Sequence, residues 1–228
     1  INNVKTFASV LMPGVQHMRH THLPEHKFVK GQPETGVELA EDLERIAMNF
    51  GGENIAACIV EPIAGSTGTL VPPKGYLKRL REICDKHGIL LIFDEVITGW
   101  GRTGSAFAAQ EWGVTPDIMT MAKATTNGVV PMGVVAVKEE MYDTVLDASK
   151  NPEGTPELFH GYTYSGIPVA VAAALAVQDI FDNEDIFKRA KEMSPYFQDG
   201  LHSLKDLKEV VSIRGYGMMG GIEMRMKE

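Results

Sequence analysis

Cysteine, long apolar runs and surplus basic charge are all scarce in this sequence. The two cysteines, Cys58 and Cys84, lie in apolar runs without CxxC spacing. This excludes a disulfide framework and indicates reduced, buried thiols in a cytoplasmic protein. No run of about 18 apolar residues occurs, so no membrane-spanning helix is predicted. With 22 basic against 30 acidic residues, the formal net charge is −8. Nucleic acid is therefore not expected as the main partner, because no basic surplus neutralises phosphates.

The composition is otherwise that of a globular protein. The chain has 228 residues, of which 44% are apolar, which suffices for one ordinary domain or for one large and one small domain. The first residue is Ile1, and no signal peptide is recognisable. We therefore expect the sequence to be a piece of a longer protein.

After residue 36, short apolar runs alternate with helical patterns. Residues 1–36 show no clean period and are predicted to be irregular. The apolar runs predict strands at 56–60, 89–96, 117–123 and 132–137, and one-sided apolar patterns predict helices at 37–49 and 76–88, the second ending at Gly88. Fully apolar strands separated by helices predict an α/β fold, a mostly parallel sheet with helices on both faces.

The pattern changes near Pro168. A long Ala-rich helix over 169–181 precedes a charged amphipathic helix over about 184–204, and 210–224 reads as two strands around a Gly-rich turn. We predict that residues 1–167 belong to a large domain, that 168–206 are connecting helices, and that 207–228 begin a small α+β domain that is cut off at Glu228.

Glu61, Asp94 and Lys123 each lie at the carboxyl end of a predicted strand, and ligands bind at the carboxyl ends of parallel strands. A partly desolvated lysine forms a Schiff base with an aldehyde, and a carboxylate beside a pyridine nitrogen keeps that ring protonated. Asp94 and Lys123 thus suit pyridoxal phosphate (PLP). The alternative is a buried Asp94–Lys123 ion pair without chemistry, and the spacing alone leaves both open.

Three further segments are open to more than one interpretation. Residues 160–166, HGYTYSG, place hydroxyl groups before a helix, where Thr163 suits an anion and Ser165 suits a plain N-cap. Residues 99–104, GWGRTG, are a weak candidate for a phosphate loop, since no P-loop signature is present. No metal site is predicted, because neither a helical i, i+4 spacing nor a nearby cysteine accompanies the histidines His17, His20, His22 and His26.

Taken together and in this order, four motifs resemble the class III PLP-dependent aminotransferases. They are IVEPIAGSTG, ILLIFDEVITGWGRTG, PDIMTMAKATTNGVVPMG and FHGYTYSGIP, and with their flanks they cover essentially the whole chain. Three longer stretches are most similar to the ω-amino acid:pyruvate (β-alanine–pyruvate) branch: PGVQHMRHTHLPEHKF, PETGVELAEDLE and LVPPKGYLKRLREICDKHGILLIFDEVITG.

The resemblance implies a fold-type I PLP enzyme that works as a homodimer, or a dimer of dimers, with shared active sites. It places the Schiff-base lysine at Lys123, the partner of the pyridine nitrogen at Asp94, and Val96 against one face of the cofactor ring.

Other cofactor positions follow from the same motifs. Glu61 matches the glutamate of the family's EP motif, in the pocket behind the cofactor. Thr163 would reach the phosphate of the neighbouring subunit's cofactor, with Tyr162 and His160 close by.

The implied activity is a ping-pong transfer of an amino group from a β-alanine-like ω-amino acid to pyruvate, with Lys123 as the general base. Ornithine- and GABA-type relatives commonly carry a Glu where this chain has Ser66, which favours the ω-amino acid:pyruvate branch. Ala124, Thr125 and Ile167 depart from the commoner AKGLTNG and GHP patterns without removing a reacting group.

Relatives are roughly twice as long as this chain. Their phosphate loop, ring-stacking aromatic and carboxylate-binding arginine have no counterpart in these residues. Taurine, aliphatic diamines and aryl amines remain alternative donors. A non-catalytic fragment of such an enzyme is a further alternative, although intact Lys123, Asp94 and Thr163 argue against it for the full-length protein.

Overall fold

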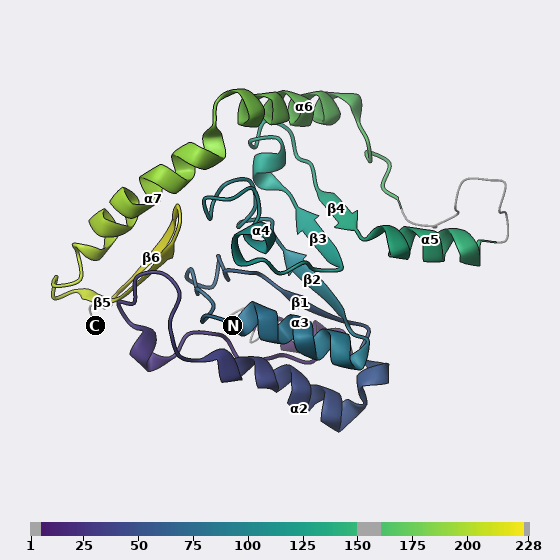
Figure 1. Ribbon diagram of the computed structural model, residues 1–228, viewed down its shortest axis with the longest axis horizontal. Coiled ribbons are helices and arrows are strands. Elements are labelled where there is room, and N and C mark those ends of the chain that lie inside the picture. Colours follow the sequence, from purple (N-terminus) through teal and green to yellow (C-terminus); the bar gives the residue numbers. More distant parts are fainter. Residues whose placement is uncertain (1–5, 150–160, 226–228) are drawn as a thin grey trace.

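The computed structural model describes residues 6–149 and 161–225. The predicted irregularity of the first 36 residues is confirmed: their described part contains only short turns of helix, including the 3₁₀ turns η1 (Ala8–Val10) and η2 (Pro24–His26). The polypeptide then builds a four-stranded sheet, and a long helical arm leads from it to a separate two-stranded hairpin (Figure 1).

The larger sheet has the strand order β1-β2-β3-β4. Strands β1 (Ala57–Val60), β2 (Leu90–Asp94) and β3 (Ile118–Met121) are parallel, whereas β4 (Val134–Val137) pairs antiparallel with β3. The mostly parallel sheet is therefore confirmed, and each strand is shorter than the apolar run that predicted it. In β2, residues on one face are fully buried and residues on the other are half-buried.

Helix α3 (Tyr76–His87) covers the buried face of the sheet, and α2 (Glu41–Phe50) packs outside α3 (Figure 1). The predicted helix over 37–49 starts as a 3₁₀ turn, η3 (Val37–Ala40), before α2. Gly88 ends α3 in the left-handed region at φ 68°, as its C-cap position predicted. The main core forms between these helices and the strands, with the side chains of Leu80, Ile83, Leu91 and Phe93 at its centre.

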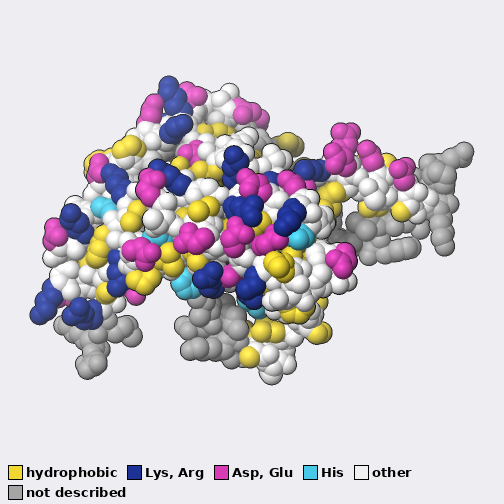
Figure 2. Space-filling model, turned by 60° about the horizontal axis from the view of Figure 1, so that its bottom comes forward, with side chains coloured by type: hydrophobic (Ala, Val, Ile, Leu, Met, Phe, Trp, Pro, Cys, Tyr) yellow, Lys and Arg dark blue, Asp and Glu magenta, His cyan; other side chains and the backbone are white. Residues whose placement is uncertain are grey.

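Opposite charges lie side by side on the surface of the α2–α3 layer. The space-filling view in Figure 2 shows acidic and basic side chains interspersed on this face. Two of the ion pairs connect the helices directly, Arg79 with Glu41 and Lys86 with Glu44. Exposed pairs of this kind contribute little to stability, so the buried apolar contacts hold the two helices together.

Asp117 joins four elements at the start of β3. Its carboxylate accepts hydrogen bonds from Arg81 of α3 at 2.6 Å, from Lys138 after β4 at 2.7 Å and from the Leu91 N–H of β2 at 2.7 Å. Burial alone would raise the pKa of Asp117, but the bonds from Lys138, Leu91 and Arg81 outweigh burial and lower it to about 2. The charged carboxylate therefore stabilises the folded state.

We expect Asp117→Asn to lower the free energy of unfolding of the full-length protein by about 2–3 kcal/mol, because Arg81 would lose a buried counter-ion. Since the folded-state pKa lies below the unfolded value of about 3.9, this stabilisation is present above pH 4 and is lost as the pH falls towards 2. Urea denaturation at pH 7 and pH 3 measures both effects.

Asp85→Asn is the matched control, because Asp85 also pairs with Arg81 but is largely exposed. We expect it to change stability by less than about 0.5 kcal/mol. Equal effects of the two substitutions would contradict the role assigned to Asp117.

In the described residues after β4, the chain forms three helices and a hairpin. Helix α5 (Glu139–Ala148) follows β4; α6 (Pro168–Asn183) and α7 (Ile186–His202) form the long arm. Strands β5 (Val210–Tyr216) and β6 (Met219–Met224) then pair antiparallel, as predicted for 210–224, and β5 packs on α7. None of the helices that the structure describes has the length and apolar character needed to span a bilayer.

Candidate functional site

The parallel strands bring three predicted residues to one edge of the sheet. Glu61 follows β1, Asp94 ends β2, and Lys123 lies two residues after β3. Asp94 is in register with Thr120 of β3, which sets the Asp94 backbone beside the segment that leads to Lys123. The Glu61 carboxylate accepts a hydrogen bond from the Gly65 N–H at 2.8 Å and so holds the turn after β1.

Lys123 has an unusual backbone conformation. The strand predicted to run to residue 123 stops at Met121, and Lys123 begins the 3₁₀ turn η5 (Lys123–Thr125) with φ 50°. A left-handed conformation costs a non-glycine residue about 1–3 kcal/mol and is concentrated at functional sites. The turn is secured by the Trp100 indole N–H, which donates to the Thr125 hydroxyl at 3.0 Å. The structure thus orients Lys123 away from the strand direction.

The adjacent carboxylates of Asp94 and Glu95, at the end of β2, have different roles. Asp94 is half-buried, and one of its oxygens accepts the Val96 N–H at 3.1 Å. Glu95 is fully buried and accepts hydrogen bonds from Thr98 and from the Ala108 and Ala109 N–H groups at the start of α4 (Ala108–Trp112). Burial raises the pKa of Glu95. Glu95 therefore caps a helix, whereas Asp94 remains available to a ligand.

The ion-pair alternative for Asp94 and Lys123 is wrong. Among residues 6–149 and 161–225, neither side chain has an ion-pair partner, and the two do not pair with each other. A carboxylate and an amine that lie at one sheet edge and form no ion pair are groups that an external ligand can engage. This observation favours a binding site over a structural bridge.

Lys123 and Val96 line the same pocket, which has a volume of about 730 Å³. Its walls come from the loop after β1, the loop after β2, the Lys123 turn, α7 and the β5–β6 hairpin. Three of its lining residues, Thr69, Lys123 and Asn127, have positive φ angles of 55°, 50° and 50°. Strained backbone is therefore gathered around this pocket.

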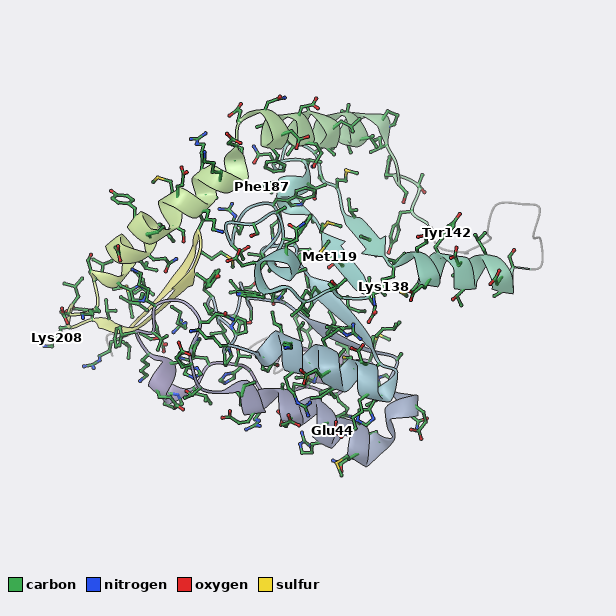
Figure 3. The ribbon with its side chains drawn as sticks, viewed as in Figure 1. Glu44, Met119, Lys138, Tyr142, Phe187 and Lys208 are labelled. Carbon is green, nitrogen blue, oxygen red and sulfur yellow. The ribbon has the colours of Figure 1, made fainter. Side chains whose placement is uncertain are left out.

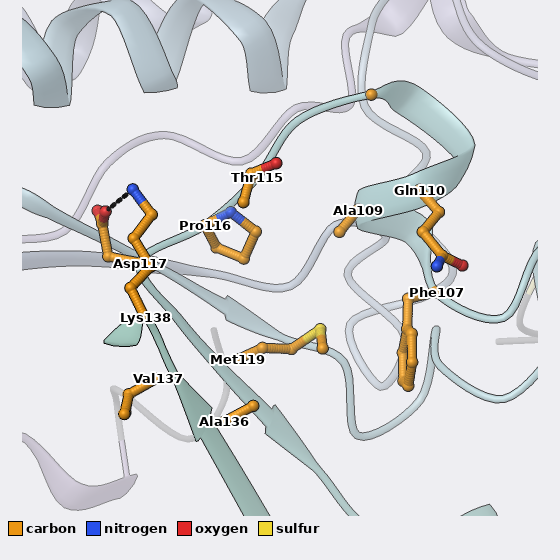
Figure 4. A pocket seen from close by; sticks show the side chains of 11 residues that line it. Phe107, Ala109, Gln110, Thr115, Pro116, Asp117, Met119, Ala136, Val137 and Lys138 are labelled. Atoms are coloured by element: carbon orange, nitrogen blue, oxygen red, sulfur yellow. Dashed lines mark ion pairs between the residues drawn. The ribbon is translucent and has the colours of Figure 1, made fainter. Parts of the chain in front are cut away.

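A second pocket of about 560 Å³ lies between α4, β3 and β4 (Figure 4). Phe107, Met119 and Val137 supply apolar walls, and the charges of Lys138 and Asp117 neutralise each other at one end. It contains none of the residues predicted from the sequence to act in a site, so the chemistry is assigned to the Lys123 pocket.

Thr163 and Tyr162 are exposed and lie outside the Lys123 pocket of their own chain. His160, the third predicted residue of this segment, lies outside the described residues. Ser165 is not the N-cap of α6: Ile167 holds that position, and the Ser165 hydroxyl accepts the Tyr162 N–H at 3.2 Å. The plain capping interpretation of Ser165 is therefore wrong, because Pro168 fixes the helix start further along the chain.

The glycine-rich loop at 99–104 does not form a phosphate cradle. Four of its backbone N–H groups donate to backbone carbonyls, those of Gly99, Trp100, Gly101 and Gly104. The carbonyl of Glu95 accepts the first bond, and carbonyls within residues 101–106 accept the other three. The Trp100 ring stacks on Phe181 of α6 at a centroid distance of 5.5 Å. Phe187 of α7, which extends from that helix toward the sheet side (Figure 3), packs near Gly101. The loop acts as a packing junction.

His26 has a structural role. It is buried, its Nδ1 accepts the Leu23 N–H at 3.1 Å, and its Nε2 lies 3.4 Å from the Thr35 hydroxyl. In the part of the chain that the structure describes, no three His, Cys, Asp or Glu side chains are grouped as metal ligands.

Sequence reasoning missed the pocket walls contributed by distant elements. Phe197 from α7 and Met218, Met219 and Gly220 from the hairpin line the pocket that also contains Lys123. Arg102 lines it too, although its loop was considered only for phosphate. The apolar residues carry no local signal, because a Phe or Met at helical or strand spacing is typical of any core.

Comparison with known proteins shows the family to which the chain belongs. The profile of the Aminotransferase class-III family matches residues 2–228. The chain belongs to this family. It is 55% identical over 215 residues to the omega-aminotransferase of Caulobacter vibrioides, covering 94% of this chain and 48% of the relative. It is 48% identical over 227 residues to the beta-alanine–pyruvate aminotransferase of Pseudomonas aeruginosa, covering 99% and 50%.

Solved structures of transaminases share the fold. The omega transaminase from Pseudomonas jessenii in complex with PMP superposes with a TM-score of 0.87 at 33% identity, over 98% of this chain and 49% of that protein. The fold-type I assignment is therefore confirmed. The chain spans about half the length of the curated relatives that it matches.

Proposed function

We propose that the full-length protein is a PLP-dependent aminotransferase that transfers the amino group of a short ω-amino acid such as β-alanine to pyruvate. The observation that carries the proposal is Lys123, which lines a pocket at the sheet edge, has a left-handed conformation and forms no ion pair among the described residues. Asp94 ends β2 at the same edge without lining the pocket, and it forms no ion pair among the described residues either. The relatives named for ω-amino acid and β-alanine–pyruvate transfer support the substrate class.

The described residues fit the cofactor. PLP supplies an electron-accepting ring when bound. Lys123 would hold its aldehyde carbon, and the Asp94 oxygen that makes no bond to Val96 would face its ring nitrogen. Val96, which lines the pocket, would contact the ring, and Glu61 would keep the neighbouring turn in place.

Lys123 then has two tasks in turnover. Its Nζ holds the cofactor between reactions, and once displaced by the donor's amine it moves the proton at the amino-bearing carbon of the substrate. The Asp94 carboxylate would place a negative charge beside the ring nitrogen, which favours the protonated form of the ring.

Two copies of the chain would share the active sites. Thr163 and Tyr162 are exposed and do not line the Lys123 pocket of their own chain. This placement supports a role in binding the cofactor phosphate of a neighbouring subunit. Apolar side chains are also exposed along α6, including Val169, Leu175 and Ile180. These features support a homodimer or a dimer of dimers.

The proposal also includes the location of the protein in the cell and its division into domains. We place the protein in the cytoplasm, which the two buried, free cysteines support. We also retain the division into a large domain (1–167), connecting helices (168–206) and the start of a small domain (207–228), which the two separate sheets support.

The substrate class depends on Ser66, which lines the pocket and carries no charge. A glutamate there would neutralise a carboxylate-binding arginine when the substrate lacks an α-carboxylate, and serine cannot. We expect pyruvate to exceed 2-oxoglutarate in kcat/KM by more than about tenfold, with β-alanine preferred over ornithine, GABA and taurine as donor. Steady-state assays of the purified full-length protein measure these ratios.

A preference for ornithine with 2-oxoglutarate would overturn the branch assignment. A preference for putrescine would point to the diamine alternative, since a putrescine–pyruvate aminotransferase from Pseudomonas aeruginosa is 41% identical to this chain. Absence of any transamination in a PLP-loaded protein would favour the non-catalytic alternative.

A further inference from the structure

A chain of two hydrogen bonds spans Lys123. The Trp100 indole N–H can only donate, so the Thr125 hydroxyl accepts it, at 3.0 Å. That hydroxyl donates its own proton to the Ala122 carbonyl at 3.1 Å. Ala122 and Thr125 lie on either side of Lys123 in the chain, and Thr125 is buried, with 3% of its surface exposed. The two bonds therefore fasten the backbone both before and after the lysine.

The backbone hydrogen bonds of the lysine turn are local. The N–H groups of residues 125–128 donate to the carbonyls of residues 122–124. In the described part of the chain, the Trp100 indole is the only side chain from outside residues 122–130 that hydrogen-bonds to residues 123–125. Lys123 has a φ of 50°, and such a conformation persists only where the surroundings impose it. Trp100 supplies support of this kind from outside the turn.

The Trp100 indole is itself held by other aromatic rings. It stacks on Phe181 of α6 at a centroid distance of 5.5 Å and an interplanar angle of 11°. Phe107, just before α4, meets it edge-on at 4.9 Å. Phe187 of α7 in turn packs on Phe181 at 5.0 Å (Figure 3). Aromatic contacts of this geometry are attractive, so they fix the direction in which the indole N–H points.

Lys123 needs a fixed backbone because of what its amine does in the proposed reaction. The amine lies at the end of a long, flexible side chain, which is exposed in this chain. No ion pair holds it among the described residues. A general base must lie within hydrogen-bond reach of the proton that it moves, and a displacement of about 1 Å costs about 100-fold in rate. The conformation of the turn therefore bears directly on turnover.

We infer that Trp100 is a positioning residue for Lys123: through the Thr125 hydroxyl, it holds the turn so that the amine reaches the amino-bearing carbon of the substrate. The inference rests on the proposed function, because it concerns proton transfer by the same lysine. Neither Trp100 nor Thr125 lines the Lys123 pocket, so both act through the lysine and not on the substrate. Leucine, which the commoner AKGLTNG pattern has in place of Thr125, carries no hydroxyl and could not form these bonds.

The test uses the full-length, PLP-loaded protein with Trp100→Phe, which keeps an aromatic ring and removes the donor. With β-alanine and pyruvate we expect kcat to fall by about 10- to 100-fold. The KM for β-alanine should change by less than about threefold, because substrate contacts are not affected. With deuterium on the amino-bearing carbon of β-alanine, the isotope effect on kcat should be no smaller than that of the wild type, because the slowed step moves this proton.

A double-substitution cycle separates the hydrogen bonds from packing. Thr125→Val removes the hydroxyl at nearly constant volume and should lower kcat at least as far as Trp100→Phe does. The double variant Trp100→Phe/Thr125→Val should stay within about twofold of Thr125→Val alone, because the two side chains act as one unit. Thr125→Ser keeps the hydroxyl, so its kcat should stay within about threefold of the wild type.

A matched control and a measurement without cofactor complete the design. Trp112 is the other tryptophan of the chain; it packs against Tyr216 and does not line the pocket. Trp112→Phe should therefore change kcat by less than about twofold. Amide hydrogen exchange in the full-length apoprotein reports on the turn itself. In Trp100→Phe, the N–H groups of residues 125–128 should exchange about three- to tenfold faster, whereas those of β1 and β2 should not change.

Several results would overturn the inference. Losses that add in the double variant would assign Trp100 to packing, and a higher KM with unchanged kcat would assign it to the substrate site. A kcat within about twofold of the wild type in both single variants, unchanged exchange in the turn or a smaller isotope effect would each contradict it as well. Failure of the proposed function itself looks different, because the wild-type protein would then not attach PLP at Lys123 at all.

Discussion

Lys123→Ala is expected to abolish covalent attachment of PLP and to lower kcat by at least about 10⁴-fold. The loss is this large because one side chain serves as both the nucleophile and the general base. The amine has no ion-pair partner among the described residues, so removing it leaves no buried charge uncompensated. Alanine meets the same left-handed φ of 50° that lysine already tolerates. The variant should therefore fold while losing its chemistry.

One readout tests this expectation independently of turnover. Borohydride reduction of the PLP-loaded protein followed by peptide mass spectrometry should locate the cofactor on Lys123 in the wild type and on no lysine in the variant. Lys74→Ala is the control, because Lys74 is an exposed lysine paired with Glu34 and lies outside the pocket. Normal turnover by Lys123→Ala would end the assignment.

Asp94→Asn is expected to lower kcat by about 10²- to 10⁴-fold, because charge stabilisation at a developing carbanion contributes a few kcal/mol and each 1.4 kcal/mol is about tenfold. Asparagine keeps the size and the acceptor oxygen for the Val96 N–H but loses the charge that faces the ring nitrogen. We expect PLP affinity to fall much less than kcat. Equilibrium dialysis and steady-state assays separate the two.

The neighbouring Glu95→Gln is the matched control for Asp94→Asn. Glu95 is fully buried and bonds to Thr98 and to the first N–H groups of α4, so its role is to hold that helix. This substitution should lower the free energy of unfolding by about 1–2 kcal/mol with a small effect on kcat. A loss of less than about tenfold for Asp94→Asn, or a similar loss for both, would make Asp94 structural.

The sequence alone determined the local elements and the order of the motifs. Apolar runs predicted all four strands of the larger sheet, because a buried strand needs consecutive apolar side chains. Gly88 predicted the end of α3, because glycine enters the left-handed region at no steric cost. Asp94 and Lys123 were singled out because a residue that follows a parallel strand lies at the edge where ligands bind.

Only the tertiary structure decided which neighbours these residues have. It divided the adjacent Asp94 and Glu95 between an open site and a helix cap, since consecutive side chains at a strand end face opposite ways. It secured the strained turn that begins at Lys123 through a hydrogen bond from the Trp100 indole N–H to the Thr125 hydroxyl. It also brought Arg102, Phe197 and Met218 to the lysine's pocket. Periodicity reports only which face of an element is apolar, whereas these contacts join segments that are far apart in the chain and meet only when α7 and the hairpin pack beside the sheet edge.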